Sequence, residues 1–155
     1  MIVIYFLTWT LLLYMMHRLV HIVPLLSKNH YHHHAFILIN GNPGFHWSNL
    51  FLFNDDWPST IDLWITEVIP TILFCWLIND YSLLLFYWLW AALLQETLEH
   101  NENFNVYALT MGQWHMQHHY NSKCNFGLFI PIWDKLFRTE FAGKPKVGRQ
   151  PSKLR

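Results

Sequence analysis

The sequence is poor in charge and in cysteine. Lys, Arg, Asp and Glu make up 13% of the 155 residues, about half the share that is usual in a soluble domain. The two cysteines, Cys75 in an apolar run and Cys124 in a polar loop, argue against a disulfide framework. The formal net charge is zero with histidine neutral, so no nucleic acid partner is expected.

Several enzyme motifs are also absent. The sequence has no Cys-x2-Cys pair for a zinc ribbon or an iron–sulfur cluster. It has neither a Gly-rich phosphate loop nor the Gly-x-Ser-x-Gly turn of serine hydrolases. The His-Glu-x-x-His motif of zinc peptidases is missing too, because the residue after His17 is Arg18. These absences argue against the common peptidase, hydrolase and nucleotide-binding classes.

Apolar and aromatic residues are abundant instead, at 53% hydrophobic with nine Trp, seven Tyr and twelve Phe. Residues 1–26 predict one apolar helix, bent near Pro24. This helix lacks the basic start and the small-residue cleavage site of a signal peptide, so we expect a retained membrane anchor. Two more apolar runs, 61–78 and 82–95, predict a membrane hairpin around Asn79–Tyr81. Each run is short against the roughly 20 residues of a full span.

Two acidic residues, Asp62 and Glu67, interrupt the first arm of this hairpin. An ionisable residue in a membrane segment is a functional candidate by default. In a shallow hairpin Glu67 can also reach the surface, so it is left outside the predicted site. The stretches Asn40–Gly44 and Asn54–Thr60 are rich in turn-forming residues. The aromatic segment between them, residues 45–53, is expected at the membrane interface.

The basic residues predict which side of the membrane each segment faces. None of the ten lysines and arginines lies at the N-terminus or in the Asn79–Tyr81 turn. They are Arg18, Lys28, Lys123, Lys135, Arg138, Lys144, Lys146, Arg149, Lys153 and Arg155. Because cytoplasmic segments carry the excess of Lys and Arg, the N-terminus and the turn are predicted outside. All eleven histidines then fall on the cytoplasmic side.

The histidines form recurring patterns. His17 and His21 are four residues apart, and two His-x2-His-His motifs begin at His30 and His115. On a helix each group projects from one face, whereas His32 would project opposite to His30 and is interpreted as a spare. His100 stands alone. The candidate metal ligands are His17, His21, His30, His33, His34, His100, His115, His118 and His119.

Neutral imidazole is a good ligand for Fe, Zn, Cu and Ni. Eight or nine imidazoles are too many for one ion and suit two ions that share a site. The internal stretch Lys28–His34 is thus either a His-rich polar connector or part of a metal site. His46 is expected to be an interfacial or hydrogen-bonding residue.

Two other functions use histidine at a membrane. A His-rich protein could store or transport Zn or Cu, although metal transporters tend to place ligands in mid-span together with carboxylates. A b-type haem would need only two axial histidines and would leave most of the others unused.

The motifs HRLVH, HYHHH and HMQHH, followed by NFGLFIPIWDKLF, resemble the sterol desaturase and fatty acid hydroxylase superfamily of integral-membrane di-iron oxygenases. The resemblance spans residues 11–140. It implies that the nine candidate histidines hold two Fe ions, with His100 as the isolated later ligand. It also implies O2, a lipid substrate with an unactivated C–H bond, and an electron-donor protein similar to cytochrome b5 or ferredoxin. The reaction would be hydroxylation or desaturation.

One departure from the family pattern is Phe104, where a second later histidine is common. A side chain of Asn or Glu, or water, would then complete the shell of one iron. Glu96, one helical turn before His100, could orient that ring, with Glu99 as the alternative. Equally, both carboxylates could belong to a solvated helix end. Asp134 could orient a ligand histidine, cap the following helix or pair with Arg138, and a structural role is favoured slightly.

These inferences predict an all-α integral-membrane protein with an N-terminal anchor helix, a membrane helical hairpin and a His-rich metal site at the cytosolic face. Residues 1–141 would form the membrane di-iron domain and residues 142–155 a basic flexible tail. The membrane would be a bacterial inner membrane or the endoplasmic reticulum.

Overall fold

A computed structural model describes residues 1–54 and 56–143, so most of the predicted tail lies outside the described residues. The fold is mostly helical, as predicted. The one addition among the described residues is a pair of short antiparallel strands, β1 (Asn105–Val106) and β2 (Met111–Gly112).

The first two helices meet at a proline. Helix α1 covers Ile2–Ile22, and helix α2 covers Pro24–Asn40. The prediction of one helix over residues 1–26 is therefore wrong. Val23 has an extended backbone (φ −86°, ψ 114°), because a residue before proline is pushed out of the helical region while proline itself suits the first helical position. The His-rich stretch is consequently helical, inside α2.

The first arm of the predicted hairpin begins earlier than expected. Helix α3 (Trp57–Leu63), a π-helical segment (Trp64–Val68) and helix α4 (Ile69–Ile78) follow without a break. Asp56 caps α3, since its side chain accepts a hydrogen bond from the backbone N–H of Ser59. The prediction of a turn up to Thr60 is thus wrong from Trp57 onward.

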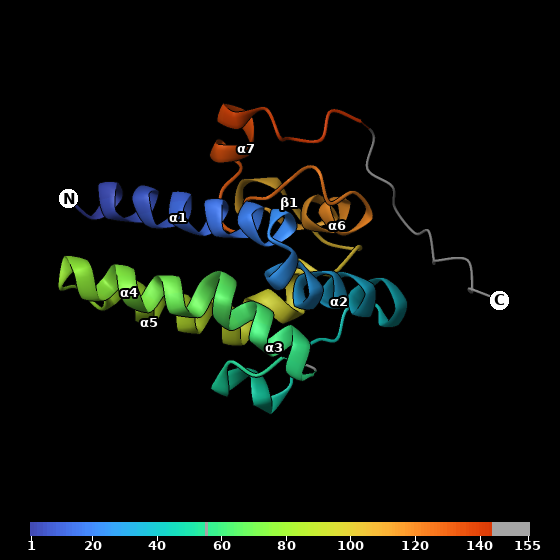
Figure 1. The fold of residues 1–155 in the computed structure, drawn as a ribbon, viewed down its shortest axis with the longest axis horizontal. Coiled ribbons are helices and arrows are strands. Elements are labelled where there is room, and N and C mark those ends of the chain that lie inside the picture. Colours follow the sequence, from blue (N-terminus) through green and yellow to red (C-terminus); the bar gives the residue numbers. More distant parts are fainter. Residues whose placement is uncertain (55, 144–155) are drawn as a thin grey trace.

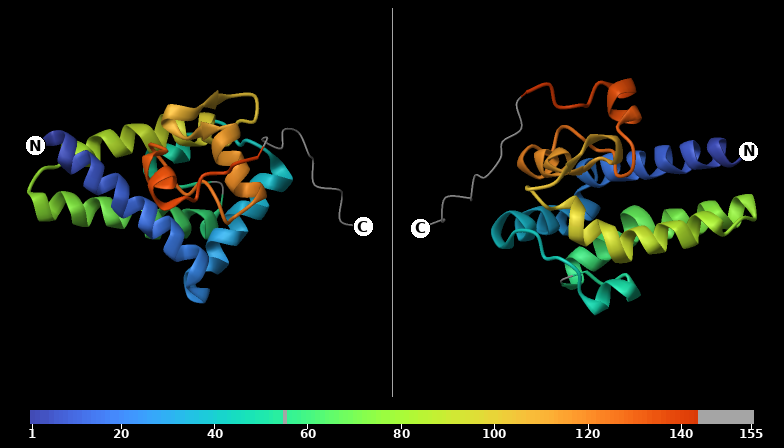
Figure 2. Two further views of the ribbon diagram at one scale, coloured as in Figure 1. Left: turned by 90° about the horizontal axis from the view of Figure 1, so that it is seen from above. Right: turned by 180° about the vertical axis from the view of Figure 1, so that it is seen from behind.

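The second arm extends further than predicted. Helix α5 (Ser82–Trp90) continues as a π-helical segment over Ala91–Glu99, four residues beyond the predicted end. Asn79, in the left-handed conformation, ends α4 and starts the short turn to α5. Figures 1 and 2 show α4 and α5 running side by side along α1.

The long helices share one apolar core. Trp9 and Leu13 of α1 pack with Phe74 of α4, Tyr87 of α5 and Phe129. The Trp9 indole also donates a hydrogen bond of 2.9 Å to the Thr71 hydroxyl. Many apolar side chains on the outside of these helices stay exposed. By length and apolarity, Ile2–Ile22 and Trp57–Ile78 are each long enough to cross a membrane.

The remaining elements are short. A 3-10 helix (Trp47–Phe51) precedes α3, another (Tyr107–Leu109) separates the strands, and α6 (Gln113–Tyr120) and α7 (Ile132–Phe137) follow. In Figure 1 the N-terminus and the α4–α5 turn lie at one end of the molecule, and α2 and α6 lie towards the other. The nine candidate histidines lie in the last turns of α1, in α2, at position 100 after the second π-helical segment, and in α6.

Candidate metal centre

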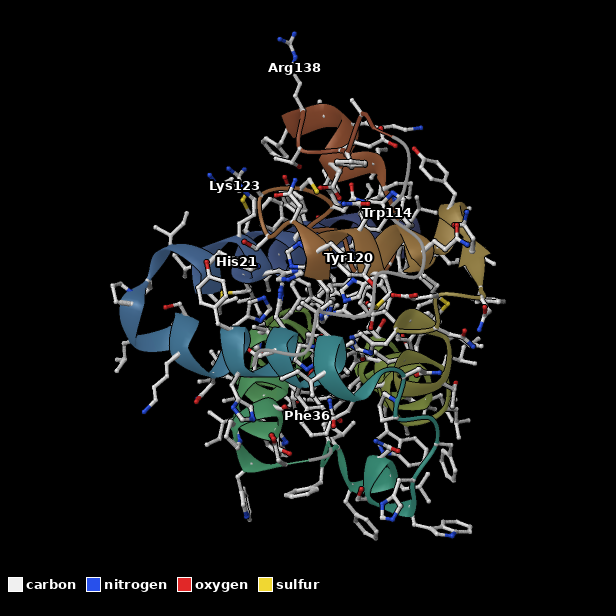
Figure 3. The ribbon with its side chains drawn as sticks, turned by 90° about the vertical axis from the view of Figure 1, so that its right-hand side faces the viewer. His21, Phe36, Trp114, Tyr120, Lys123 and Arg138 are labelled. Atoms are coloured by element: carbon white, nitrogen blue, oxygen red, sulfur yellow. The ribbon has the colours of Figure 1, made fainter. Side chains whose placement is uncertain are left out.

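Four segments bring the nine candidate histidines together. They come from the last turns of α1, from α2, from the residue after the second π-helical segment, and from α6. Figure 3 looks onto this end, where α6, with Trp114 and Tyr120 labelled, lies above α2, and His21 of α1 lies to the side of α6. Ring nitrogens gather beneath α6. The structure thus places every predicted ligand in one region.

The first group contains five histidines whose nearest ligand atoms all lie within 4.8 Å of one another. The five are His17, His21, His30, His34 and His118. Neighbouring Nε2 atoms in this group are 2.9 to 3.2 Å apart. Two imidazoles bound at right angles to one ion, with bonds near 2.1 Å, would place their nitrogens about 3 Å apart. The spacing therefore suits a shared ion.

The hydrogen bonds on the other ring nitrogens determine where the lone pairs lie. His17 Nδ1 is 2.8 Å from the Phe126 carbonyl oxygen, and His118 Nδ1 is 2.7 Å from that of Cys124. His30 Nδ1 is 2.8 Å from Asp62 Oδ2. Because carbonyl and carboxylate oxygens accept, these Nδ1 atoms carry the hydrogens and each Nε2 presents a lone pair.

Lone pairs therefore face one another inside the first group. His17 Nε2 and His30 Nε2 are 3.2 Å apart, and neither has a hydrogen to donate in this tautomer. Such a pair is repulsive unless a cation lies between the two nitrogens. The donor set thus fits a transition-metal ion, which accepts electron pairs from neutral imidazoles.

The second group joins two sets that share His100, namely His33, His100 and His119, and Glu99, His100 and His115. The ring centroid of His33 lies 5.1 Å from those of His100 and His119. His115 Nε2 and His119 Nε2 are 3.0 Å apart. Within the described ranges 1–54 and 56–143, neither nitrogen of the buried His100 ring has a hydrogen-bond partner. A bound ion would satisfy this otherwise costly buried polar ring.

The two groups are adjacent. The rings of His34 in the first group and His119 in the second are stacked with centroids 4.3 Å apart. Burial is the main cause that lowers the pKa of both rings well below the usual range. Burial also lowers the pKa of the His33 ring to about 4. These rings are neutral near pH 7, which is the protonation state that binds metals.

Two carboxylates back the histidines, one in each group. Asp62 accepts from His30 Nδ1, as above, and Glu99 Oε1 lies 3.3 Å from His115 Nδ1. A carboxylate behind a ligand imidazole fixes the ring and raises its basicity. Glu99 was the alternative to Glu96 in the sequence analysis, and the side chain of Glu96 lies outside the described residues. The sequence analysis missed the role of Asp62, whose only signal was an acid in an apolar run.

Asp134 does not contact a ligand histidine. Its carboxylate accepts hydrogen bonds of 2.8 Å from the backbone N–H groups of Phe126 and Gly127 and one of 2.7 Å from the Thr139 hydroxyl. The role of Asp134 is therefore structural. It holds the loop whose Phe126 carbonyl accepts the hydrogen bond of His17.

A small cavity of about 30 Å³ adjoins the histidines, and rings of both groups line it. Glu67 lines the same cavity, although the sequence analysis left it outside the site. Its carboxylate oxygen Oε1 accepts a 2.8 Å hydrogen bond from Gln95 Nε2. Glu67 belongs to the first π-helical segment and Gln95 to the second. Neither position has a sequence pattern that predicts this contact.

Two histidines lie outside the groups, as expected. His32 is exposed, and its Nε2 lies 2.6 Å from Asp56 Oδ2. The His46 side chain accepts a hydrogen bond from the backbone N–H of Ser48 and so caps the 3-10 helix Trp47–Phe51. Both rings therefore contact neighbouring residues and take no part in the two histidine groups.

Comparison with known proteins gives one match. The family model described as fatty acid hydroxylase matches residues 2–139, a range that includes all nine histidines, Asp62 and Glu99. The comparisons with curated proteins and with solved structures gave no match.

Proposed function

Because this chain belongs to the fatty acid hydroxylase family, part of the sterol desaturase and fatty acid hydroxylase superfamily, we propose that it is a membrane-bound di-iron oxygenase that acts on a lipid. The observation that carries the proposal is the convergence of nine imidazoles into two adjacent groups, in the first of which the Nε2 lone pairs of His17 and His30 face one another. The family uses iron, and two adjacent groups suit two ions.

Each group would hold one iron. The first would use His17, His21, His30, His34 and His118, and the second His33, His100, His115 and His119. When bound, the irons would use O2 and two external electrons to hydroxylate or desaturate an unactivated lipid C–H bond. Asp62 and Glu99 would keep His30 and His115 in the right tautomer. The buried position of most of these rings keeps bulk water away from the site.

The second group has four histidines against five in the first. Phe104 stands where the family often has another histidine, and its backbone carbonyl accepts a hydrogen bond from Gln113. We propose that Glu99 or water completes the shell of the second iron. The Glu99 carboxylate supports this, because it forms a possible metal-binding group with His100 and His115 and lies 3.3 Å from His115 Nδ1.

We also propose a topology and an electron donor. Helix α1 would anchor the chain, and α3–α4 and α5 would form a membrane hairpin. The histidines would lie on the cytoplasmic face of a bacterial inner membrane or of the endoplasmic reticulum. Three observations support this topology. The family is membrane-bound, and neither the N-terminus nor the α4–α5 turn contains Lys or Arg. The N-terminus and this turn also lie at the same end of the molecule (Figure 1). The electron donor, a protein similar to cytochrome b5 or ferredoxin, would then dock at the cytoplasmic face.

Two neighbouring histidines test the proposal. His33→Ala removes a ring of the second group, whereas His32→Ala, one residue earlier on α2, removes the ring that faces Asp56. We expect His33→Ala to lose about half of its iron and more than about 100-fold in product formation, because a ligand is removed. His32→Ala should stay within about twofold of the wild type in both, since it removes only an exposed ion pair. Iron analysis and lipid profiling of cells with each variant measure these effects.

The same measurements separate the competing functions. The proposal expects about two irons in each wild-type chain and no Soret band. Purification with Zn or Cu and no change in cellular lipids would favour a metal-storage or transport protein. A Soret band would indicate haem. Equal iron and equal product in His33→Ala and in the wild type would refute the ligand assignment.

A further inference from the structure

One wall of the cavity is polar although it is made by the long helices. Ser59 of α3, Glu67 of the first π-helical segment and Gln95 of the second all line it. Each of these side chains is more than nine-tenths buried. Buried polar groups in apolar helices are costly unless they are paired, so a wall of this kind indicates a ligand or a structural network.

The hydrogen bonds orient Gln95 toward a ligand. Glu67 Oε1 is 2.8 Å from Gln95 Nε2, and because a carboxylate accepts, the amide must turn its N–H groups to Glu67. The carbonyl oxygen Oε1 is then the free end of the amide. Among the described residues Gln95 Oε1 and the Ser59 hydroxyl are buried without a hydrogen-bond partner. Gln95 Oε1 is therefore an available hydrogen-bond acceptor, and a ligand group that contacts it must be a hydrogen-bond donor.

Glu67 and Gln95 both lie in π-helical segments instead of regular α-helix. Glu67 lies within the π-helical segment Trp64–Val68, and Gln95 within the π-helical segment Ala91–Glu99. A π-helical turn is rare and is frequently found at functional sites. It shifts the register of the side chains at a cost in stability. Two such segments facing each other across one hydrogen bond indicate that this contact has a function.

Glu67 and Gln95, the two π-helical residues of this wall, lie on the membrane side of the histidines. Glu67 is five residues beyond Asp62, the partner of His30, and the Thr71 hydroxyl one turn further on binds the Trp9 indole. Trp9 is eight residues before His17, towards the N-terminal end of α1 (Figure 1). In the proposed topology a ligand of this wall therefore comes from the bilayer, and the aqueous face lies on the opposite side of the metal groups.

We propose that Gln95 Oε1 accepts a hydrogen bond from an O–H or N–H group of the lipid substrate, with Ser59 as a second contact and Glu67 as the residue that positions Gln95. This inference rests on the proposed oxygenase function and narrows its substrate to lipids with a hydrogen-bond donor close to the oxidised carbon. The cavity of about 30 Å³ has room for a group the size of about two waters. It thus suits a hydroxyl or amide with its neighbouring carbon.

Two probe lipids that differ in one hydrogen-bond donor test the inference. Hexadecan-1-ol can donate from its hydroxyl, and 1-methoxyhexadecane, its methyl ether, cannot. Binding of each radiolabelled probe to the purified iron-loaded protein would be measured under nitrogen and corrected for partition into protein-free micelles. We expect the wild type to bind the alcohol about tenfold more tightly, the effect of one well-placed hydrogen bond.

Three variants then locate the contact. Gln95→Met keeps the side-chain volume but removes the acceptor, so the alcohol-to-ether ratio should fall to within about twofold of one. Glu67→Gln lets the Gln95 amide turn over and should give an intermediate ratio. Thr71→Val is the matched control, since Thr71 is a buried hydrogen-bonding residue on the same helix that does not line the cavity. Thr71→Val should lower the stability of the protein and keep the wild-type ratio of alcohol binding to ether binding.

Each result decides the matter. Equal binding of the two probes by the wild type, or no saturable binding of either, would overturn the inference and leave ordered water as the donor. An unchanged ratio in Gln95→Met would overturn it as well. Because no O2 is present, the ratio does not depend on turnover. A wild type that prefers the alcohol but forms no oxidised lipid in air, with a reduced electron-transfer protein supplied as donor, would refute the proposed oxygenase and leave this binding site standing.

Discussion

At the scale of single residues, similar pairs of side chains have different roles because their burial differs. His30–Asp62 and His32–Asp56 are both histidine–aspartate contacts between α2 and the start of the first hairpin arm. The first is buried among the ligands, and the second is exposed. A carboxylate orients a ring strongly only where water does not compete for the hydrogen bond. Asp62 should therefore matter for metal binding and Asp56 should not.

The variant Asp62→Asn tests this difference. Asn can present its amide N–H instead of an acceptor, which disfavours the His30 tautomer that offers the Nε2 lone pair. We expect iron affinity to fall about 10- to 100-fold, the usual effect of losing a carboxylate behind a ligand histidine. Competition with a chelator measures the affinity.

The matched control is Asp56→Asn, which keeps an N-cap for α3 because Asn caps helices as well as Asp does. It should leave iron affinity unchanged. If both variants bound iron like the wild type, Asp62 would have no role in orienting His30.

At the scale of elements, the site depends on interruptions in regular structure. The break at Val23 turns α2 back against α1, and the two π-helical segments bring Glu67 and Gln95 face to face. The loop from His100 to α6 also depends on an irregular backbone conformation, at Gly112. Gly112 has a positive φ of +70°, and an added Cβ would overlap the Phe104 carbonyl. This close approach keeps His100 near His115.

The variant Gly112→Ala should therefore separate these two histidines. We expect a lower melting temperature and reduced iron content. Gly41→Ala is the control, because Gly41 also has a positive φ of +81° but an added Cβ there meets nothing within 4 Å. It should cost only the strain of a backbone conformation that is essentially restricted to glycine (φ 81°, ψ −163°), on the order of 1–3 kcal/mol, and keep the iron. Thermal unfolding and iron analysis of both variants would show the difference, and equal behaviour would argue against a role for the Phe104 contact.

At the scale of the whole molecule, the long helices separate two ends. The α4–α5 turn and the N-terminus share one end, and α2 and α6, which contain six of the nine candidate ligands, lie towards the other (Figure 1). The proposed topology places these ends on opposite faces of the bilayer. Each end carries an exposed residue suitable for labelling, Lys28 of α2 and Ser82 at the start of α5.

Single cysteines at these residues test the topology. In membrane vesicles of known orientation, a membrane-impermeant thiol reagent should label Lys28→Cys only from the cytoplasmic side and Ser82→Cys only from the other side. The native Cys75 and Cys124 are both buried and should contribute little background. Labelling of both variants from the same side would refute the transmembrane arrangement and require a hairpin that lies within one leaflet.

Much of the protein follows from local patterns in its sequence. The long apolar runs predict the helices of α1, α4 and α5, and the three- and four-residue spacings predict which histidines share a face. The same spacing argument separates His32 from His30 and His33 correctly, because helical periodicity is a local property of the chain. The proline at position 24 marks a boundary, although its effect was predicted as a bend instead of a complete break.

What only the tertiary structure decided are the contacts between distant segments. Asp62 reaches His30 across 32 positions of the chain, Glu67 reaches Gln95 across 28, and the Phe126 carbonyl reaches His17 across 109. No periodicity links such residues, because their meeting depends on how whole helices pack and where π-helical turns shift the register. The sequence by itself therefore determined which side chains could bind metal, and the packing of the helices decided which ring nitrogens face one another and what lies behind them.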